Sequence, residues 1–328
     1  MTTKKKPSRS PGEPRTARWV SLLAFLLSHA SLAFGGRIAV VKPSGNPIEG
    51  SSLKINVDLI LVNASVSDRR QRFVTGLGKD QFQVFEDGVQ QTVTQFSNVD
   101  LPASIGLVVD TSGSMTDKII KAKDALITFL KTSNQQDEYF LLPFANRPVL
   151  STELTTDTAR IQNRVAFMHA GGATTLYDAI YLGLEKIKQG HNAKKALLLV
   201  TDGEDTASRY SLADVRDALK EADCQIFVIG ILSPGLPNDN LGFSVSDLLA
   251  DMADMTGGTA FFPSSASDLP DICEQIAREI KSEYLLGYTP SNAARDGRWR
   301  KIKVRVHAPN ENRSFSIHAK TGYYAPSH

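Results

Sequence analysis

Residues 105–115, with the sequence IGLVVDTSGSM, constrain the fold of this chain more than any other segment. They begin as a continuous run of apolar and β-branched residues, which is typical of a strand buried on both faces of a parallel sheet. The run stops at Asp110, and the pattern changes to helical periodicity a few residues later. Open α/β sheets bind ligands in the crevice at the carboxyl ends of their strands. The polar loop after Asp110 is therefore placed where such a fold binds its ligands.

Segments with strand and helix patterns alternate from Ser104 to Lys281. Apolar residues recur at helical spacing in residues 117–131, 157–168, 176–188, 212–222, 244–255 and 269–281. Apolar runs of strand length lie between them, at residues 138–144, 148–155, 195–201, 225–232 and 259–262. Such alternation predicts the α/β fold class, with a mostly parallel sheet and helices on both of its faces.

Strand patterns also occur on both sides of this α/β region. Before it, Leu53–Ser67 alternate in polarity, and Phe82–Val93 form an expected hairpin around the tight turn Asp87–Gly88. After it, strands are expected at residues 283–288, 299–307, 315–319 and 322–324. A sheet built from one end alone would be small for independent stability, so the two ends are expected to pair in one accessory β subdomain.

The length of 328 residues favours about two domains, and the patterns divide the chain further. The expected segments are a signal peptide at residues 1–33, a linker at 34–51, an N-terminal β segment at 52–101, an α/β domain at 102–283 and a C-terminal β segment at 284–328.

Residues 1–33 have the composition of a signal peptide. A basic head precedes the apolar segment Trp19–Leu27, and the small residues Ser31 and Ala33 form an expected cleavage site. The apolar segment is short for a membrane span, which needs roughly 20 residues. The protein is therefore expected to be secreted, periplasmic or part of the cell envelope. An uncleaved N-terminal anchor is the alternative, and it would be the membrane attachment.

The formal charge of +2 hides an uneven distribution. The first 33 residues carry +5 and the remainder therefore −3, so no basic surface is expected to attract nucleic acid. The two cysteines, Cys224 and Cys273, could form a disulfide in an exported protein. Both lie in apolar patterns, which favours two buried thiols instead.

The loop after Asp110 combines this carboxylate with the hydroxyls of Ser112 and Ser114, and Gly113 lies between the serines. Hard cations prefer oxygen ligands, and Mg²⁺ usually keeps several waters in octahedral geometry. The loop therefore predicts a cation site. The alternative is a plain turn in which Asp110 and Ser112 cap the next helix.

Two later segments complete a known pattern. A glycine pair at residues 171–172 precedes Thr174, and the strand at residues 195–201 ends at Asp202. Together with D-x-S-x-S, these features resemble the metal-ion-dependent adhesion site of von Willebrand factor type A domains. The resemblance implies the doubly wound strand order and bound Mg²⁺ or Mn²⁺. It assigns the metal to Asp110, Ser112, Ser114, Thr174 and Asp202. Thr175 is the alternative to Thr174, because the alignment could slip by one residue.

The flanking segments carry a second resemblance. The leading VTGL and FQVFEDG and the trailing YLLGYTP and KTGYYAP are similar to a bacterial family of exported proteins related to von Willebrand factor A. This likeness covers about residues 53–325. It implies the architecture and export of the chain more firmly than a ligand.

The resembled site implies binding of a partner protein. Neutral hydroxyls do not quench the charge of the cation, so it stays electrophilic toward a Glu or Asp carboxylate on the partner. An exported, non-enzymatic protein for metal-dependent protein binding or adhesion is therefore expected. The alternatives are a metal-dependent hydrolase or phosphatase, and an accessory factor in assembly of an envelope complex. The sequence has no phosphate-binding loop, GxSxG or HExxH motif.

Overall fold

The computed structural model describes residues 59–232, 244–307 and 314–327. The expected signal peptide, the linker and the first residues of the N-terminal β segment lie outside these residues. The chain divides into two compact units, residues 1–54 and 55–328, and all described residues belong to the second. Within the described part, no helix has both the length and the apolar character needed to cross a membrane.

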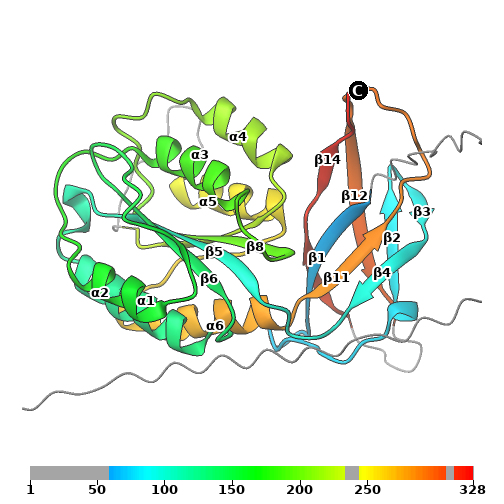
Figure 1. The fold of residues 1–328 in the computed structure, drawn as a ribbon, viewed down its shortest axis with the longest axis horizontal. Coiled ribbons are helices and arrows are strands. Elements are labelled where there is room, and N and C mark those ends of the chain that lie inside the picture. Colours follow the sequence, from blue (N-terminus) through cyan, green and yellow to red (C-terminus); the bar gives the residue numbers. More distant parts are fainter. Residues whose placement is uncertain (1–58, 233–243, 308–313, 328) are drawn as a thin grey trace, which may run out of the picture. The chain divides into compact units, whose positions relative to one another are not determined.

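A six-stranded sheet forms the centre of the α/β region (Figure 1). In spatial order its strands are β10 (Ala260–Phe261), β9 (Gln225–Gly230), β8 (Lys194–Thr201), β5 (Ala103–Asp110), β6 (Glu138–Phe144) and β7 (Thr152–Thr155). All neighbours are parallel except β7, which runs antiparallel to β6 at the sheet edge. Every residue of β5 is buried, because this strand is covered on both faces.

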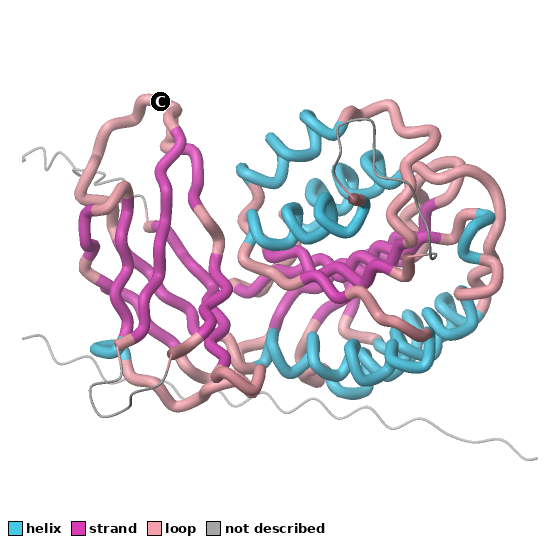
Figure 2. The backbone as a smooth tube through the Cα atoms, turned by 180° about the vertical axis from the view of Figure 1, so that it is seen from behind, coloured by secondary structure: helices cyan, strands magenta, loops and turns pink. Residues whose placement is uncertain are grey.

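Helices pack on both faces of this sheet (Figure 2). One face carries α1 (Ile119–Thr132), α2 (Thr158–Ala166) and α6 (Leu269–Lys281). The other face carries α3 (Leu176–Ile187), α4 (Leu212–Glu221) and α5 (Val245–Thr256). Strand β5 serves both apolar cores, since Leu107 belongs to the first and Val108 to the second. The predicted doubly wound, mostly parallel α/β fold is confirmed.

Local signals fix where α5 begins and ends. The hydroxyl of Ser244 accepts a hydrogen bond from the Asp247 N–H, and the Asp247 carboxylate accepts one from Ser244, which forms a capping box. The helix ends at Thr256 and is followed by Gly257, whose φ of +80° suits glycine. A Cβ on Gly257 would lie 2.4 Å from backbone atoms of Ala319 and Lys320, so the close approach of these segments also requires glycine.

Strands from both ends of the described chain form two further sheets of four strands each. The first contains β13 (Ser316–Ala319), β1 (Ile60–Ser67), β11 (Tyr284–Tyr288) and β4 (Val93–Ser97). The second contains β14 (Gly322–Tyr324), β12 (Trp299–Val306), β2 (Phe82–Glu86) and β3 (Val89–Gln91). β1 pairs with β11, and β2 pairs with β12. Their inner faces share one apolar core that includes Val62, Val84 and Tyr284.

Short 3₁₀ helices are η1 (Lys79–Gln81), η2 (Gly113–Met115) and η3 (Ala266–Asp268).

The hairpin expected at residues 82–93 is shorter in the structure. β2 and β3 pair around Asp87–Gly88, which both have positive φ, but β4 begins at Val93 and pairs with β11 in the other sheet. Gln91 and Val93 are buried and Thr92 between them is exposed, so the alternation of burial continues through the crossing. The sequence pattern therefore gives no sign that the chain changes sheets here.

Cys224 and Cys273 are both buried and free. They belong to the two separate cores on opposite faces of the six-stranded sheet. Burial raises the pKa of each thiol to about 12. These are inert buried thiols, as favoured from the sequence.

Candidate metal site

Two of the five predicted ligands lie at the carboxyl ends of neighbouring strands. Asp110 is the last residue of β5, and Asp202 follows Thr201 at the end of β8. The strands are parallel, with Val109 opposite Val200, so both aspartates lie at the same end of the sheet, where the central strands have their carboxyl ends. The Thr201 hydroxyl donates a hydrogen bond to Oδ2 of Asp110 over 2.8 Å, which joins the two strand ends.

The two predicted serines lie next to each other in the loop after β5. The Ser112 N–H donates to Oδ1 of Asp110 over 2.8 Å, and the hydroxyl oxygens of Ser112 and Ser114 are 3.0 Å apart. Ser112 occupies the N-cap position of η2, yet its hydroxyl makes no capping hydrogen bond there. Ser112 is buried, whereas Ser114 is exposed. The hydroxyl pair thus extends from the protein interior to the surface.

The predicted glycine pair brings a second loop against this one. The Gly171 N–H donates to the Thr111 carbonyl over 2.8 Å, and the Gly113 N–H donates to the Gly172 carbonyl over 3.0 Å. Gly172 has a φ of +94°, and a Cβ there would lie 2.7 Å from Oδ1 of Asn146. Glycine at this position therefore allows both the backbone conformation and the close approach.

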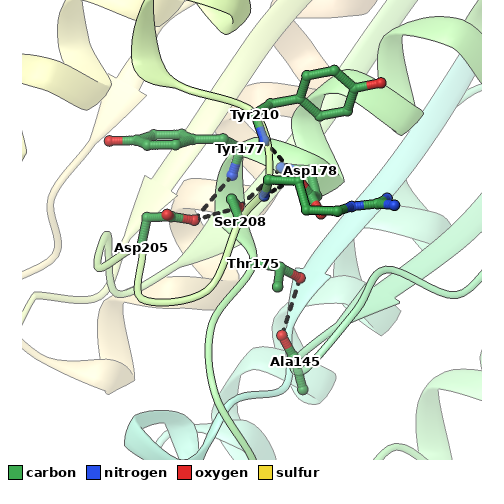
Figure 3. A network of polar contacts seen from close by, with 8 residues as sticks. Ala145, Thr175, Tyr177, Asp178, Asp205, Ser208 and Tyr210 are labelled. Atoms are coloured by element: carbon green, nitrogen blue, oxygen red, sulfur yellow. Dashed lines mark hydrogen bonds and ion pairs between the residues drawn. The ribbon is translucent and has the colours of Figure 1, made fainter.

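Thr174 and Thr175 follow the glycine pair and are both buried. The Thr175 hydroxyl donates to the Ala145 carbonyl over 3.0 Å, as Figure 3 shows. The Thr174 backbone bonds to the loop after β8, because its N–H donates to Oγ1 of Thr206 over 3.0 Å. Thr174 therefore ties the loop of the glycine pair to the loop after β8 through its backbone.

A polar network fixes the loop after β8 against the start of α3 (Figure 3). Asp178 accepts hydrogen bonds from the backbone N–H groups of Arg209 and Tyr210, over 2.8 and 3.1 Å. Asp205 accepts one from the Tyr177 N–H over 3.3 Å. No sequence motif marks Asp178, which lies on the buried face of a helix. These contacts hold the loop that carries Asp202.

Asp202 is the second carboxylate of the candidate site and is 3% exposed. Its Oδ2 lies 3.3 Å from Nζ of Lys118, which precedes α1. Its Oδ1 is buried and has no hydrogen-bond partner among the described residues. A buried carboxylate oxygen without a partner is costly, so this atom is available to a further ligand.

Burial dominates the electrostatics of Asp110. It raises the pKa of this carboxyl above the ordinary value, and the charge of Asp202 acts in the same direction. Hydrogen bonds from Ser112 and Thr201 oppose the shift without cancelling it. An ionised Asp110 is therefore costly as long as no further cation lies near both carboxylates.

The donor set fits a hard cation. Within the described ranges no group of three or more His, Cys, Asp or Glu residues could hold a metal. The candidate site has two carboxylates and otherwise hydroxyls, so it falls outside that kind of cluster. Oxygen donors of this mixture suit Mg²⁺ or Mn²⁺, and Oδ1 of Asp202 is a free acceptor among the described residues.

Lys118 and Thr201 are two polar residues of the site that the sequence motifs did not predict. Thr201 ends the apolar run of β8 next to Asp202, and its hydroxyl at that position was an available signal. Lys118 lies three residues after the DTSGSM segment, in a helix expected to begin at residue 117. The structure starts α1 at Ile119, which leaves Lys118 at the N-cap position.

The fold defines a doubly wound α/β domain with hydroxyl and carboxylate groups at the ends of its central strands. The von Willebrand factor type A domain family matches residues 104–275, more than half of the chain. The chain belongs to this family, and the resemblance to von Willebrand factor type A domains drawn from the sequence is confirmed.

One curated protein is similar to this chain in sequence. The chain is 26% identical over 230 residues to inter alpha-trypsin inhibitor heavy chain 4 of Mus musculus, over 62% of this chain and 23% of the relative. The chain thus spans less than a quarter of the length of that protein.

Solved structures are similar at lower identity. A von Willebrand factor type A protein from Catenulispora acidiphila has a TM-score of 0.48 and 13% identity, over 82% of this chain and 75% of that one. An aerotolerance-related membrane protein from Bacteroides fragilis has a TM-score of 0.43 and 16% identity, over 54% and 98%. The PilB minor pilin from Streptococcus sanguinis has a TM-score of 0.44 and 15% identity, over 57% and 63%.

Proposed function

We propose that this protein binds Mg²⁺ or Mn²⁺ at the candidate metal site and uses the metal to bind a carboxylate of a partner protein. The five ligands would be Asp110, Ser112, Ser114, Thr174 and Asp202. The protein is a non-enzymatic interaction module, and adhesion is one form that such binding takes.

The observation that carries the proposal is the state of the two aspartates. Asp110 and Asp202 are buried at the carboxyl ends of paired strands, and Oδ1 of Asp202 lacks a hydrogen-bond partner among the described residues. A divalent cation would stabilise two buried carboxylates at the ends of neighbouring strands. The alternative of a plain turn explains the hydrogen bond from the Ser112 N–H to Asp110, but not the buried Oδ1 of Asp202 that lacks a partner among the described residues.

Hydrogen bonds orient Asp110 for metal binding, and the hydroxyl ligands limit the negative charge of the site. Thr201 and the Ser112 N–H orient Asp110, so its carboxylate is fixed before a metal arrives. The neutral hydroxyls of Ser112, Ser114 and Thr174 add oxygen ligands without adding negative charge. The metal would supply a Lewis-acidic position for a Glu or Asp carboxylate of the partner. No specific observation in the described part of the chain favours the hydrolase alternative.

We also propose the organisation expected from the sequence. Residues 1–33 would direct export, residues 34–51 would act as a linker, and residues 102–283 would form the von Willebrand factor A domain. The segments 52–101 and 284–328 would form the accessory β region. Secretion of a fusion to residues 1–33, compared with the same fusion lacking them, tests the export step.

Calorimetric titration of Mg²⁺ and Mn²⁺ into chelator-stripped protein tests the metal site. The expected result is saturable binding at about one site, as the octahedral oxygen site predicts. Asp202→Asn should lose this binding, whereas Asp217→Asn on the exposed face of α4 should keep it. Titrations without heat for either metal would contradict the proposal.

A matched pair of peptides tests the carboxylate. Gly-Glu-Gly should shift amide signals of residues around Ser114 in Mg²⁺ but not in EDTA, and Gly-Gln-Gly should shift none in either buffer. Equal shifts from both peptides would contradict carboxylate recognition.

A further inference from the structure

A lysine already pairs with the candidate metal site. Nζ of Lys118 lies 3.3 Å from Oδ2 of Asp202, and the side chains are 17% and 4% exposed. The pair is therefore largely shielded from solvent, where an ion pair is stronger than at the surface. Of the two carboxylate oxygens of Asp202, Oδ1 is the one left without a hydrogen-bond partner among the described residues.

The position of Lys118 is unfavourable for the helix that it precedes. It occupies the N-cap of α1, its side chain makes no capping hydrogen bond, and the first turn of the helix has no acidic residue. The N-terminal end of a helix carries partial positive charge, which repels a lysine ammonium. The local signals of the helix start therefore do not explain a lysine at this position. The ion pair with Asp202 offsets the repulsion.

The two carboxylates of the candidate metal site explain the lysine at position 118 better. Asp110 and Asp202 place two carboxylates in a buried location. Without a divalent cation, the Lys118 ammonium supplies one compensating charge to Asp202. A metal bound to Asp202 would compete with that ammonium for the same carboxylate, and the two cations would repel each other.

We propose that Lys118 is a tethered counter-ion of Asp202 in the metal-free protein and that an entering divalent cation must displace it. Lys118 thereby lowers the metal affinity of this particular domain. The inference rests on the proposed metal site, which it deepens by naming the residue that regulates its occupancy. The metal site then fills only where the divalent cation is abundant, and the metal-free protein remains folded.

The test compares the metal affinity of the full chain with that of Lys118→Gln by calorimetric titration of Mg²⁺ and Mn²⁺. The expected result is tighter binding by about tenfold, which corresponds to ~1.4 kcal/mol. Lys121→Gln is the matched control, because it removes the same charge from an exposed position on α1 and should leave the affinity unchanged. Lys118→Arg keeps the charge and should keep the weak affinity.

A second measurement needs no metal. In EDTA, Lys118→Gln should melt at a lower temperature than the parent, because Asp202 loses its counter-ion, whereas Lys121→Gln should melt with the parent. Saturating Mg²⁺ should then raise the melting temperature of Lys118→Gln by more than that of the parent.

The outcomes separate this inference from the proposed function. Binding by Lys118→Gln alone, or tighter binding than the parent, supports the counter-ion. Equal or weaker metal binding by Lys118→Gln, beside clear binding by the parent, overturns the counter-ion role of Lys118 and leaves the proposal of the metal site standing. Absence of binding by both proteins overturns the metal site and the counter-ion together.

Discussion

The Thr201 hydroxyl donates a hydrogen bond to Oδ2 of Asp110 over 2.8 Å, so the ends of β8 and β5 are joined through a carboxylate that is also a candidate metal ligand. The other oxygen of Asp110 accepts the Ser112 N–H over 2.8 Å. Asp110 therefore has a structural role in the loop as well as a proposed role in metal binding. Substitutions that keep or remove its oxygens can separate the two roles.

Asp110→Asn should abolish metal-dependent stabilisation and leave the metal-free protein at least as stable as the parent. The amide keeps an oxygen for the Ser112 N–H, and its neutrality removes the repulsion from Asp202 and the cost of burying a charge. Asp110→Ala should also abolish the metal effect, but it should lower the free energy of unfolding by about 1–3 kcal/mol because buried donors lose their acceptor.

Thermal melts of these variants in EDTA and in Mg²⁺ provide the measurement. Asp117→Asn, an exposed change in the same loop, is the control and should retain the metal-dependent shift in melting temperature. An equal shift in Asp110→Asn and the parent would remove Asp110 from the metal site.

Ser114→Ala should weaken metal binding without affecting the fold. Ser114 is exposed, and among the described residues its hydroxyl bonds only to the Ser112 hydroxyl, so the free energy of unfolding should change by no more than about 0.5 kcal/mol. Thr116→Ala is the comparison, because that hydroxyl donates to the Gly113 carbonyl over 2.7 Å and is no proposed ligand. Calorimetry should show lower Mg²⁺ affinity for the Ser114 variant alone. The same affinity in both variants would leave Ser114 outside the metal's ligands.

The fold class could be predicted because burial leaves a periodic record in the sequence. Residues 105–109 are apolar without alternation since both faces of β5 are covered, and the helices repeat their apolar residues on the side that faces the sheet. The change of sheet at Thr92 left no such record, because Gln91 and Val93 are buried on either side of it. Strand partners depend on contacts far apart in the chain, which periodicity does not encode.

The candidate site was predictable only in part. Asp110 and Asp202 are marked by their position at the ends of apolar strands, and the serines by their spacing from Asp110. Lys118 carries no comparable mark, because an isolated lysine near a helix start is usually solvated. Its contact with Asp202 joins residues 84 positions apart, which only the three-dimensional arrangement of α1 and β8 reveals.

Removal of residues 289–328 should destabilise the accessory β region. β2 would lose its partner β12, and β1 would lose β13, which exposes the apolar core around Val62 and Val84. The expected result is a lower urea midpoint than that of the full chain. An unchanged midpoint would show that these strands contribute nothing to the stability of the remainder.

A point substitution on the inner face of β12 tests the same core with a smaller change. Val304 on β12 is 8% exposed and belongs to the shared core, whereas its neighbour Lys303 is exposed. Val304→Ala should therefore lower the free energy of unfolding by about 1–3 kcal/mol, and Lys303→Ala should change it by less than about 0.5 kcal/mol. Urea titrations that show equal costs for both would contradict the assigned inner face.

A buried carboxyl between α6 and β11 should make the stability of the protein depend on pH. Burial raises the pKa of Glu283 to about 8, against an ordinary value of 4.5, although the charge of Lys194 opposes the shift. Below pH 4.5 the carboxyl is protonated in the folded and unfolded chains alike. Between pH 4.5 and about 8 the unfolded chain releases the proton that the folded chain retains, so the free energy of unfolding falls as the pH rises.

Glu283→Gln should remove this dependence, because the amide is neutral in both states. The difference in unfolding free energy between variant and parent should grow in favour of the variant from pH 5 to pH 8. Glu274→Gln on the exposed side of α6 is the control and should follow the parent. Urea titrations at both pH values give the measurement, and parallel profiles for Glu283→Gln and the parent would show that Glu283 titrates normally in the folded protein.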